Sequence, residues 1–246
     1  MKLYRADLHI HSVLSPCGDL EMSPVNIINK AVEQKLDIIG ITDHNSTLHG
    51  PLLRKLGTKN NVYVLTGAEI TTREEVHCLA FFENDEKLED FQHFLDLHLP
   101  DIQNKPLIFG YQVVVDENEN ILMEIKPLLI AAIRQSLEEV EKKVHQLGGI
   151  FIPAHINKGV NSILGNLGFL PAGLNVDALE ITGNTDNVAF LKEHPEFLKY
   201  SILKNSDAHQ LDLIGKFVNV FEIDHIDFQE IKLALKNKNK RRLILQ

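Results

Sequence analysis

The sequence predicts an α/β fold in which strands alternate with helices. Short apolar runs recur along the chain, and several of them end in a cluster of polar residues. The segments between these runs place apolar residues at helical spacing. This alternation is typical of parallel α/β units, not of hairpins. The chain has 246 residues, 44% of them hydrophobic, which suits one α/β domain or barrel, and no linker divides it in two.

Four strands are predicted in the N-terminal third. The first ends in Asp7-Leu8-His9-Ile10-His11, and the second is the apolar run 37–42, which we expect to be buried on both faces. Ser23-Pro24 opens the helix between them, because serine caps helices and proline favours their first position. A short helix and two more strands are expected at 48–56, 61–66 and 76–82.

Residues 83–127 interrupt the alternation, and we expect them to form an insertion in a single domain that spans residues 1–246. Leu88, Phe91 and Leu95 lie at helical spacing and predict a helix. The runs 111–115 and 121–125 then predict a hairpin with its turn at 116–120.

The alternation resumes after the insertion. Apolar residues spaced three and four apart predict a long helix from Pro127 to Leu147, where Gly148-Gly149 ends it. Four further strands are expected, followed by a final helix that contains Phe228. These strands are 150–152, 178–182, 200–204 and 217–223.

Composition and charge limit the binding partners and the cellular compartment that we expect for the protein. The net charge of −9 argues against stable binding of duplex nucleic acid, and we expect the basic segment 232–242 to be a solvated face. Two cysteines in no disulfide or metal-binding pattern indicate a reducing compartment. We find neither a leader nor an apolar run of membrane-spanning length, so we expect a cytoplasmic protein without a membrane partner. The oligomeric state stays open.

Residues of metal-ligand type stand at the ends or starts of the predicted strands. Side chains alternate along a strand, so Asp7, His9 and His11 share one face. The carboxyl ends of parallel strands meet at one mouth, so the other residues should converge there. Imidazoles and carboxylates without thiolates suit Zn²⁺, Mn²⁺ or Fe²⁺ better than Ca²⁺ or Mg²⁺ alone, and their number predicts two or three divalent ions bridged by a carboxylate. The residues are His9, His11, His44, Glu69, His77, His155, Glu180, Asp207 and His209.

Five motifs, in this order, resemble those of the PHP (polymerase and histidinol phosphatase) family. The resemblance implies a distorted seven-stranded (β/α)7 TIM-like barrel of parallel strands, whose mouth holds a trinuclear metal site that hydrolyses phosphate esters. The motifs are Asp7-Leu8-His9-Ile10-His11-Ser12, Ile41-Thr42-Asp43-His44-Asn45, Gly67-Ala68-Glu69-Ile70, Pro153-Ala154-His155 and Ser206-Asp207-Ala208-His209.

The resemblance also implies a set of ligands for each of three ions. One ion would be bound by His9, His11, Glu69 and Asp207. A second would use His44 and His209 with Asp19, and the third His77 and His155, with Glu69 bridging from the first. The loop that carries Asp19 departs from the usual family pattern in its register.

We therefore expect a metal-dependent phosphoesterase that hydrolyses a phosphate ester with a metal-bound hydroxide. Asp7, Asp43 and Glu69 are the candidate catalytic residues, with Asp7 or Asp43 orienting a histidine or handling a proton. The candidates for phosphate binding are Arg73, Arg134 and Lys158. The expected substrate is a small phosphorylated molecule, a nucleotide or a short oligonucleotide. Histidinol phosphate is an alternative substrate, and a non-catalytic metal-binding or structural module is the alternative of another class.

The remaining histidines lie in predicted helices or loops, and we expect them not to bind metal. They are His49, His93, His98, His145, His194 and His225.

Overall fold

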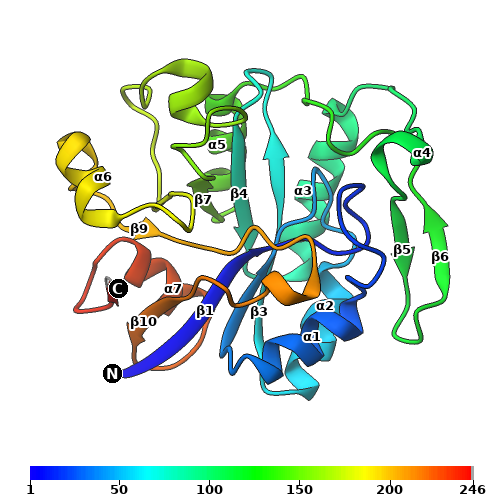
Figure 1. Ribbon diagram of the computed structural model, residues 1–246, viewed down its shortest axis with the longest axis horizontal. Helices are drawn as coiled ribbons and strands as arrows, with labels where there is room; N and C mark the ends of the chain where they lie inside the picture. Colours follow the sequence, from blue (N-terminus) through cyan, green and yellow to red (C-terminus); the bar gives the residue numbers. More distant parts are fainter. Residues whose placement is uncertain (245–246) are drawn as a thin grey trace.

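The computed structural model describes residues 1–244, and a seven-stranded sheet forms its centre (Figure 1). The strand order is β11-β10-β1-β2-β3-β4-β7. These strands are β1 (Lys2–Ile10), β2 (Ile38–Ile41), β3 (Tyr63–Thr71), β4 (His77–Phe82), β7 (Ile150–Pro153), β10 (Asn219–Ile223) and β11 (Arg242–Ile244). Two short pairs lie outside the sheet, namely β5 (Val113–Val115) with β6 (Ile121–Glu124) and β8 (Leu179–Glu180) with β9 (Ile202–Leu203).

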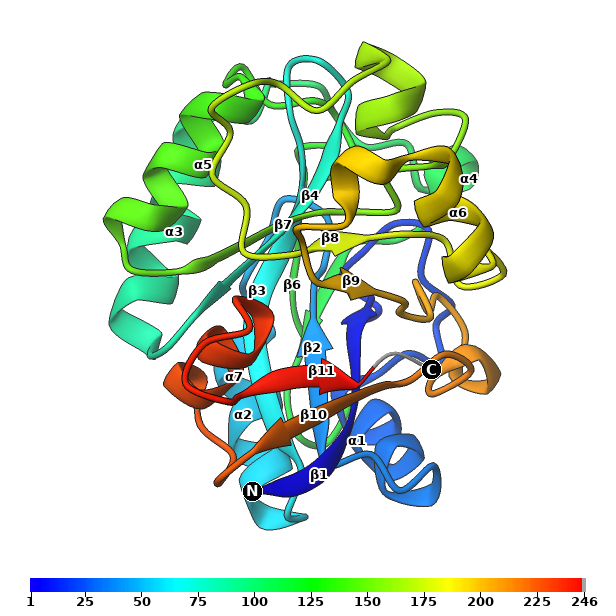
Figure 2. The same ribbon diagram turned by 90° about the vertical axis from the view of Figure 1, so that its left-hand side faces the viewer.

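The sheet is mixed, so the expectation of parallel strands throughout is wrong. Strands β1, β2 and β3 run parallel, but β4 is antiparallel to both β3 and β7, and β10 is antiparallel to β1 and β11. The reason lies at residues 72–76, where Thr72 and Val76 close a tight turn by a backbone hydrogen bond of 3.0 Å. This turn leaves no room for a crossover helix between β3 and β4. The expected α/β class is confirmed, because the seven strands curl into a half-barrel of the distorted TIM-like kind (Figure 2).

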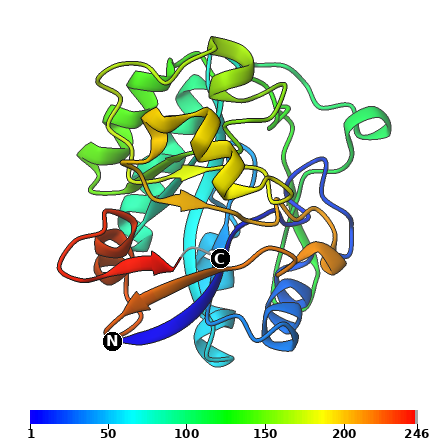
Figure 3. The ribbon, with the colours of Figure 1, turned by 60° about the vertical axis from the view of Figure 1, so that its left-hand side comes forward.

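Helices pack along the sheet in pairs. Helices α1 (Pro24–Glu33) and α2 (Gly50–Lys59) lie side by side, and their buried residues pack with β2 and β3 (Figure 1). Helices α3 (Asp85–His98) and α5 (Leu137–Gln146) share a second cluster with β4 (Figure 2). The others are α4 (Pro106–Phe109), α6 (Asn187–Glu193) and α7 (Phe228–Leu235), of which α4 stands away from the body of the molecule (Figure 3). Among residues 1–244, no helix has the length and apolar character that a bilayer crossing requires.

Helix α5 begins ten residues later than the apolar spacing predicts. Ser136 caps it and forms a capping box with Glu139, which stabilises a helix start at this point. Residues 127–135 are not helical. Within this segment, the Ile133 N–H donates to the Thr71 carbonyl at the end of β3. Its apolar residues are spaced for burial against the core, which periodicity alone does not distinguish from a helix.

The β5–β6 hairpin confirms the predicted turn and lies beside α1 and α2. Val113 and Val115 pack against Val13 of the loop that follows β1. At the turn, Glu117 pairs with two lysines of α2, and Glu119 accepts a hydrogen bond from the cap residue of α1. The hairpin is therefore held to the barrel at both its inner face and its tip.

Candidate metal centre

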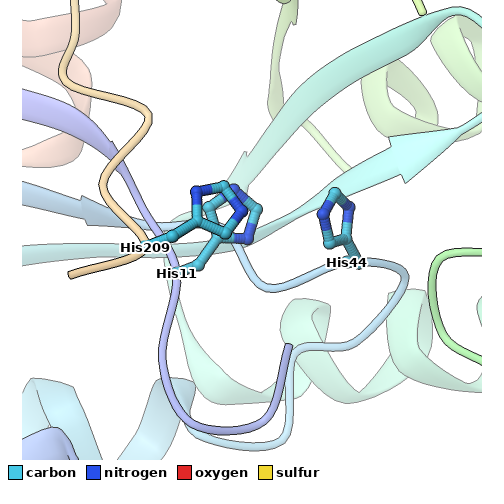
Figure 4. A group of neighbouring side chains, drawn as sticks. All are labelled: His11, His44 and His209. Carbon is cyan, nitrogen blue, oxygen red and sulfur yellow. The ribbon is translucent and has the colours of Figure 1, made fainter. Parts of the chain in front are cut away.

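The parallel strands β1, β2 and β3 bring most of the predicted metal-ligand residues to one end of the sheet. Isolated backbone bridges complete the arrangement, pairing Ile10 with Ala208 and His44 with Glu69. Residues from the two ends of the chain thereby become neighbours. The ring centroids of His11 and His209 lie 4.1 Å apart, and those of His11 and His44 lie 4.6 Å apart (Figure 4).

Four donor groups surround one point in this cluster. The Nε2 atoms of His9 and His11 are 3.1 Å apart, and Asp207 Oδ1 lies 3.4 Å from the first and 3.5 Å from the second. The Glu69 carboxylate lies 3.4 Å from each of these two nitrogens. A tetrahedral ion with ligands at about 2.0–2.1 Å separates its ligand atoms by about 3.3–3.4 Å. The distances of both carboxylates from the two nitrogens fit ligands of a single divalent ion, and His9, His11 and Glu69 form a metal-capable group at this point.

Glu69 also faces three further imidazoles, which makes its carboxylate the centre of the cluster. His77 Nδ1 and His155 Nε2 lie 2.8 and 3.1 Å from Oε1, and His44 Nδ1 lies 3.2 Å from Oε2. His44 Nδ1 is buried without a hydrogen bond, which is costly unless a cation binds there. His209 joins a separate group with His11 and His44, in which all ligand atoms lie within 4.8 Å of one another. The cluster can therefore hold metal at more than one position.

Outer hydrogen bonds orient the histidine rings. His9 Nδ1 lies 3.1 Å from both oxygens of Glu180, and His209 Nδ1 lies 2.9 Å from the Asp207 carbonyl. Because these oxygens accept, each ring carries a proton on Nδ1 and directs its Nε2 toward the cluster. Sequence reasoning noted Glu180 as a strand-end carboxylate but did not assign it this orienting contact.

The two aspartates predicted as catalytic lie behind the cluster. Asp43 accepts hydrogen bonds from the backbone of Ser12 and from the hydroxyls of Ser12 and Ser15, each at 2.7 Å. Asp7 accepts from the backbone of Ser206 and Gly215 at 3.1 and 2.9 Å, which fixes the loop that carries Asp207. Both carboxylates thus position the site from outside, and Ser12 and Ser15 are contacts that sequence reasoning missed.

Burial and mutual attraction set the charges of the cluster. Burial alone would raise the pKa of Glu69, but the imidazoles of His77 and His9 lower it well below its ordinary value. Burial alone would lower the pKa of His9, yet the carboxylates of Glu180 and Glu69 raise it well above its ordinary value. These shifts show a strongly negative environment around His9, which favours a cation.

Other groups of the site remain neutral because water is excluded. Burial lowers the pKa of His44 well below its ordinary value and lowers that of His209 to about 4. Burial also raises the pKa of Asp7 to about 6, which leaves this carboxyl mostly ionised at neutral pH. Neutral imidazoles are the form that binds a metal ion.

The backbone is strained at two residues of the cluster. His155 has φ 29° and Asp207 has φ 50°, both in the left-handed region that residues with side chains rarely adopt. The surrounding contacts hold these conformations: the His155 N–H donates to Glu180 at 2.9 Å, for example. Strain of this kind is concentrated at functional sites.

The other predicted site residues divide into one near the cluster and three outside it. Lys158 Nζ lies 3.6 Å from Asp207 Oδ2 and lines a cavity of about 260 Å³ that also borders His155. Asp19 is exposed, and its carboxylate accepts from the Glu21 backbone, outside the metal-capable groups of residues 1–244. The remaining two, Arg73 and Arg134, are exposed and lie outside the residues that line this cavity.

Comparison with protein families decides the classification. The model of the PHP domain matches residues 7–157, which is more than half of the chain. The chain belongs to the PHP domain family. This match confirms the resemblance seen in the motifs, and the His and Glu clusters described above give this PHP domain the capacity to bind metal.

Relatives of this PHP domain include longer proteins. The chain is 27% identical to the uncharacterized protein YqxK of Bacillus subtilis (strain 168), covering 99% of the chain and 65% of YqxK. The lesion-specific endonuclease PfuEndoQ of Pyrococcus furiosus shares its fold with a TM-score of 0.75 at 21% identity, covering 99% of the chain and 58% of PfuEndoQ. The chain thus spans less than two thirds of each.

A structural neighbour of similar length also exists. It is a proposed metal-dependent phosphoesterase from Bifidobacterium adolescentis, with a TM-score of 0.58 at 18% identity, covering 95% of the chain and 96% of that protein.

Proposed function

We propose that this PHP domain is a metal-dependent hydrolase of phosphate esters. The observation that carries the proposal is the arrangement of His9, His11, Glu69 and Asp207, whose donor atoms have the spacing of one tetrahedral ion. Zn²⁺, Mn²⁺ and Fe²⁺ suit imidazole and carboxylate donors. A second ion would use His44 and His209, and a third would share Glu69 with His77 and His155.

The chemistry of the site follows from these donors. When bound, divalent ions lower the pKa of a water molecule and offset the charge of a phosphoryl group. The protein supplies imidazole Nε2 ligands held in place by Glu180 and Ser15, together with a cation at Lys158 that can bind a phosphate oxygen. In this proposal Asp7 and Asp43 act by positioning the loop of Asp207 and the ring of His11.

A nucleotide or short oligonucleotide is the substrate class that we favour. The cavity beside Asp207 is lined by Lys158, Lys216 and Phe217, so it offers two cations for phosphate next to an apolar ring. Among the structural neighbours, an endonuclease Q structure holds a 27-mer duplex substrate with an abasic lesion at its active site. Histidinol phosphate remains the alternative among small phosphomonoesters.

The test combines metal analysis with a substrate panel. Purified protein is assayed for bound metal and then, with added Mn²⁺ or Zn²⁺, against phosphomonoesters, nucleotides and short oligonucleotides. We expect metal-dependent release of phosphate or cleavage products, abolished by a chelator. Metal binding without turnover of any panel member would contradict the proposal and favour a structural metal-binding module. Absence of metal binding would contradict both.

A further inference from the structure

His49 is buried next to the cluster, although it contacts none of the proposed ligands. It is 1% exposed at the start of α2, and both of its ring nitrogens have partners. Nδ1 lies 2.6 Å from the Ser12 hydroxyl, and Nε2 lies 3.0 Å from the backbone nitrogen of Val115 in β5. The ring thus connects the β5–β6 hairpin to the loop that follows β1.

The partners determine where the proton of His49 lies. The Ser12 hydroxyl donates to Asp43 Oδ2 at 2.7 Å, so its oxygen can only accept from the ring. His49 therefore donates from Nδ1, and its unprotonated Nε2 accepts from the Val115 N–H. Burial lowers the pKa of His49, although Asp43 opposes the shift, and this favours the neutral ring.

The chain of hydrogen bonds continues from Asp43 to a proposed metal ligand. Ser15 donates its hydroxyl proton to Asp43 Oδ1 at 2.7 Å. Its oxygen then accepts from His11 Nδ1 at 3.0 Å, which leaves His11 Nε2 unprotonated and facing Glu69. Because the Asp43 carboxylate can only accept, it directs the hydroxyl protons of Ser12 and Ser15, and the ring protons of His49 and His11 are then directed to the two hydroxyl oxygens.

We propose that His49 is a positioning residue for the metal centre, held by the β5–β6 hairpin and acting on His11 through Ser12, Asp43 and Ser15. The inference rests on the proposed metal-dependent function and extends it to a residue outside the ligand set. The hairpin contributes no ligand, yet it orients one.

The local structure of the hairpin supports this role. The pairing of β5 with β6 shifts register between Val114 and Val115, and the Val115 N–H is directed to His49. Val115 is 6% exposed and packs with Val13 and Val113 beside the same loop. Because the tip is fixed to α1 and α2 as well, the hairpin can hold the imidazole in one orientation.

Two substitutions distinguish the contact of His49 Nδ1 with Ser12 from the contact of His49 Nε2 with Val115. In His49→Gln, the amide oxygen can take the place of Nε2 and accept from the Val115 N–H, but the Ser12 hydroxyl oxygen loses the donor that His49 Nδ1 provided. In His49→Asn, the amide can occupy the place of Nδ1 and donate to Ser12, but it no longer reaches Val115. Loss of a direct outer partner of a metal ligand weakens binding by about 10–100-fold, and because His49 acts through such partners, the lower end of this range is the most that its loss should cost.

The experiment titrates Mn²⁺, and separately Zn²⁺, into the metal-free full chain and its variants. We expect His49→Gln to weaken binding about tenfold, and His49→Asn to weaken it less than threefold, as expected for a directional contact. In a Ser12→Ala background, His49→Gln should have little further effect, because both changes break the same path. A folded His49→Gln variant with unchanged affinity, or fully additive effects with Ser12→Ala, would overturn the inference.

A measurement on the wild type needs no variant to fold. Nitrogen NMR of the labelled imidazole should show the proton of His49 on Nδ1 and an unprotonated Nε2. The opposite tautomer would overturn the inference even if metal binds normally. A wild-type chain that binds neither Mn²⁺ nor Zn²⁺ would overturn the proposed function as well, so the two failures can be told apart.

Discussion

Replacing Glu180 by Gln tests whether the carboxylate behind His9 tunes metal affinity. Its two oxygens accept hydrogen bonds from the His9 ring, from the Asn205 amide at 2.8 Å and from the His155 backbone N–H at 2.9 Å. The residue is 2% exposed. Gln has the same shape but one oxygen fewer. Whichever way the amide points, its NH₂ group must face a donor that the carboxylate accepted.

The structure gives the size of the expected effect. One buried donor without an acceptor costs about 1–3 kcal/mol, which should appear as lower stability of the metal-free protein. The neutral amide also holds the His9 ring less firmly, and loss of an outer partner of this kind weakens metal binding by about 10–100-fold. At about 1.4 kcal/mol per factor of ten, this is a loss of about 1.4–2.8 kcal/mol in binding free energy.

The assay is a calorimetric titration of the metal-free protein with Mn²⁺, together with its thermal unfolding. The matched control is Glu230→Gln, because Glu230 is also a buried carboxylate that accepts a backbone hydrogen bond, from Asp224, but its partners lie outside the cluster. Both variants should unfold at lower temperature, and only Glu180→Gln should bind metal more weakly. Equal metal affinity in the two variants would refute the orienting role of Glu180.

Further predictions address the bridge, the phosphate cation and pH. Glu69→Gln should lower metal content by more than one ion in elemental analysis, because its carboxylate serves two proposed sites, and loss of no metal would refute bridging. Lys158→Met should lower kcat/KM for phosphate esters about tenfold with metal content unchanged, while Arg73→Met should change it less than twofold; equal effects would contradict this assignment. The hydrogen bond to Asp177 raises the pKa of His145 in the folded protein. The contribution of this contact to folding stability is therefore complete below about pH 6.5 and is lost as pH rises through the folded-state pKa of His145. Stability should therefore fall by on the order of 1 kcal/mol from acidic to alkaline pH, and an equal fall in His145→Gln would exclude this origin.

Much of the cluster could be predicted because its residues directly follow apolar runs. His9, His44 and His155 each come at the end of a strand or just after it, and strand ends in α/β folds collect at one mouth. Glu69 differs, because it lies inside β3 and reaches the cluster through the bridge with His44. Ligand-type residues could thus be recognised even where the strand boundary was displaced.

Strand direction and outer contacts could not be predicted in the same way. An apolar run shows that a strand is buried but not which way it runs, so the β3–β4 hairpin was invisible to periodicity. Partners of the orienting groups lie far apart along the chain: His49 bonds to Ser12 and Val115, which are 37 and 66 residues away. Its position at the start of a helix gave no sign of this, so it was set aside with the other helical histidines. Asp19 illustrates the converse, since a motif position placed it near the site and the backbone turned its carboxylate outward.

The backbone bridge between Ile10 and Ala208 has a consequence for how the protein is made. Residues 7–11 leave the ribosome about two hundred residues before Asp207 and His209, at a synthesis rate of about 5–20 residues per second. Until then, the His9 and His11 rings lack Asp207 of the proposed first ion, and Leu8 lacks the Asn205 side chain that holds its backbone. A nascent chain therefore lacks two of the eight proposed ligands, Asp207 and His209, for about 10–40 seconds. Occupancy of the proposed first site with all four ligands is thereby coupled to the synthesis of Asp207 and cannot precede it.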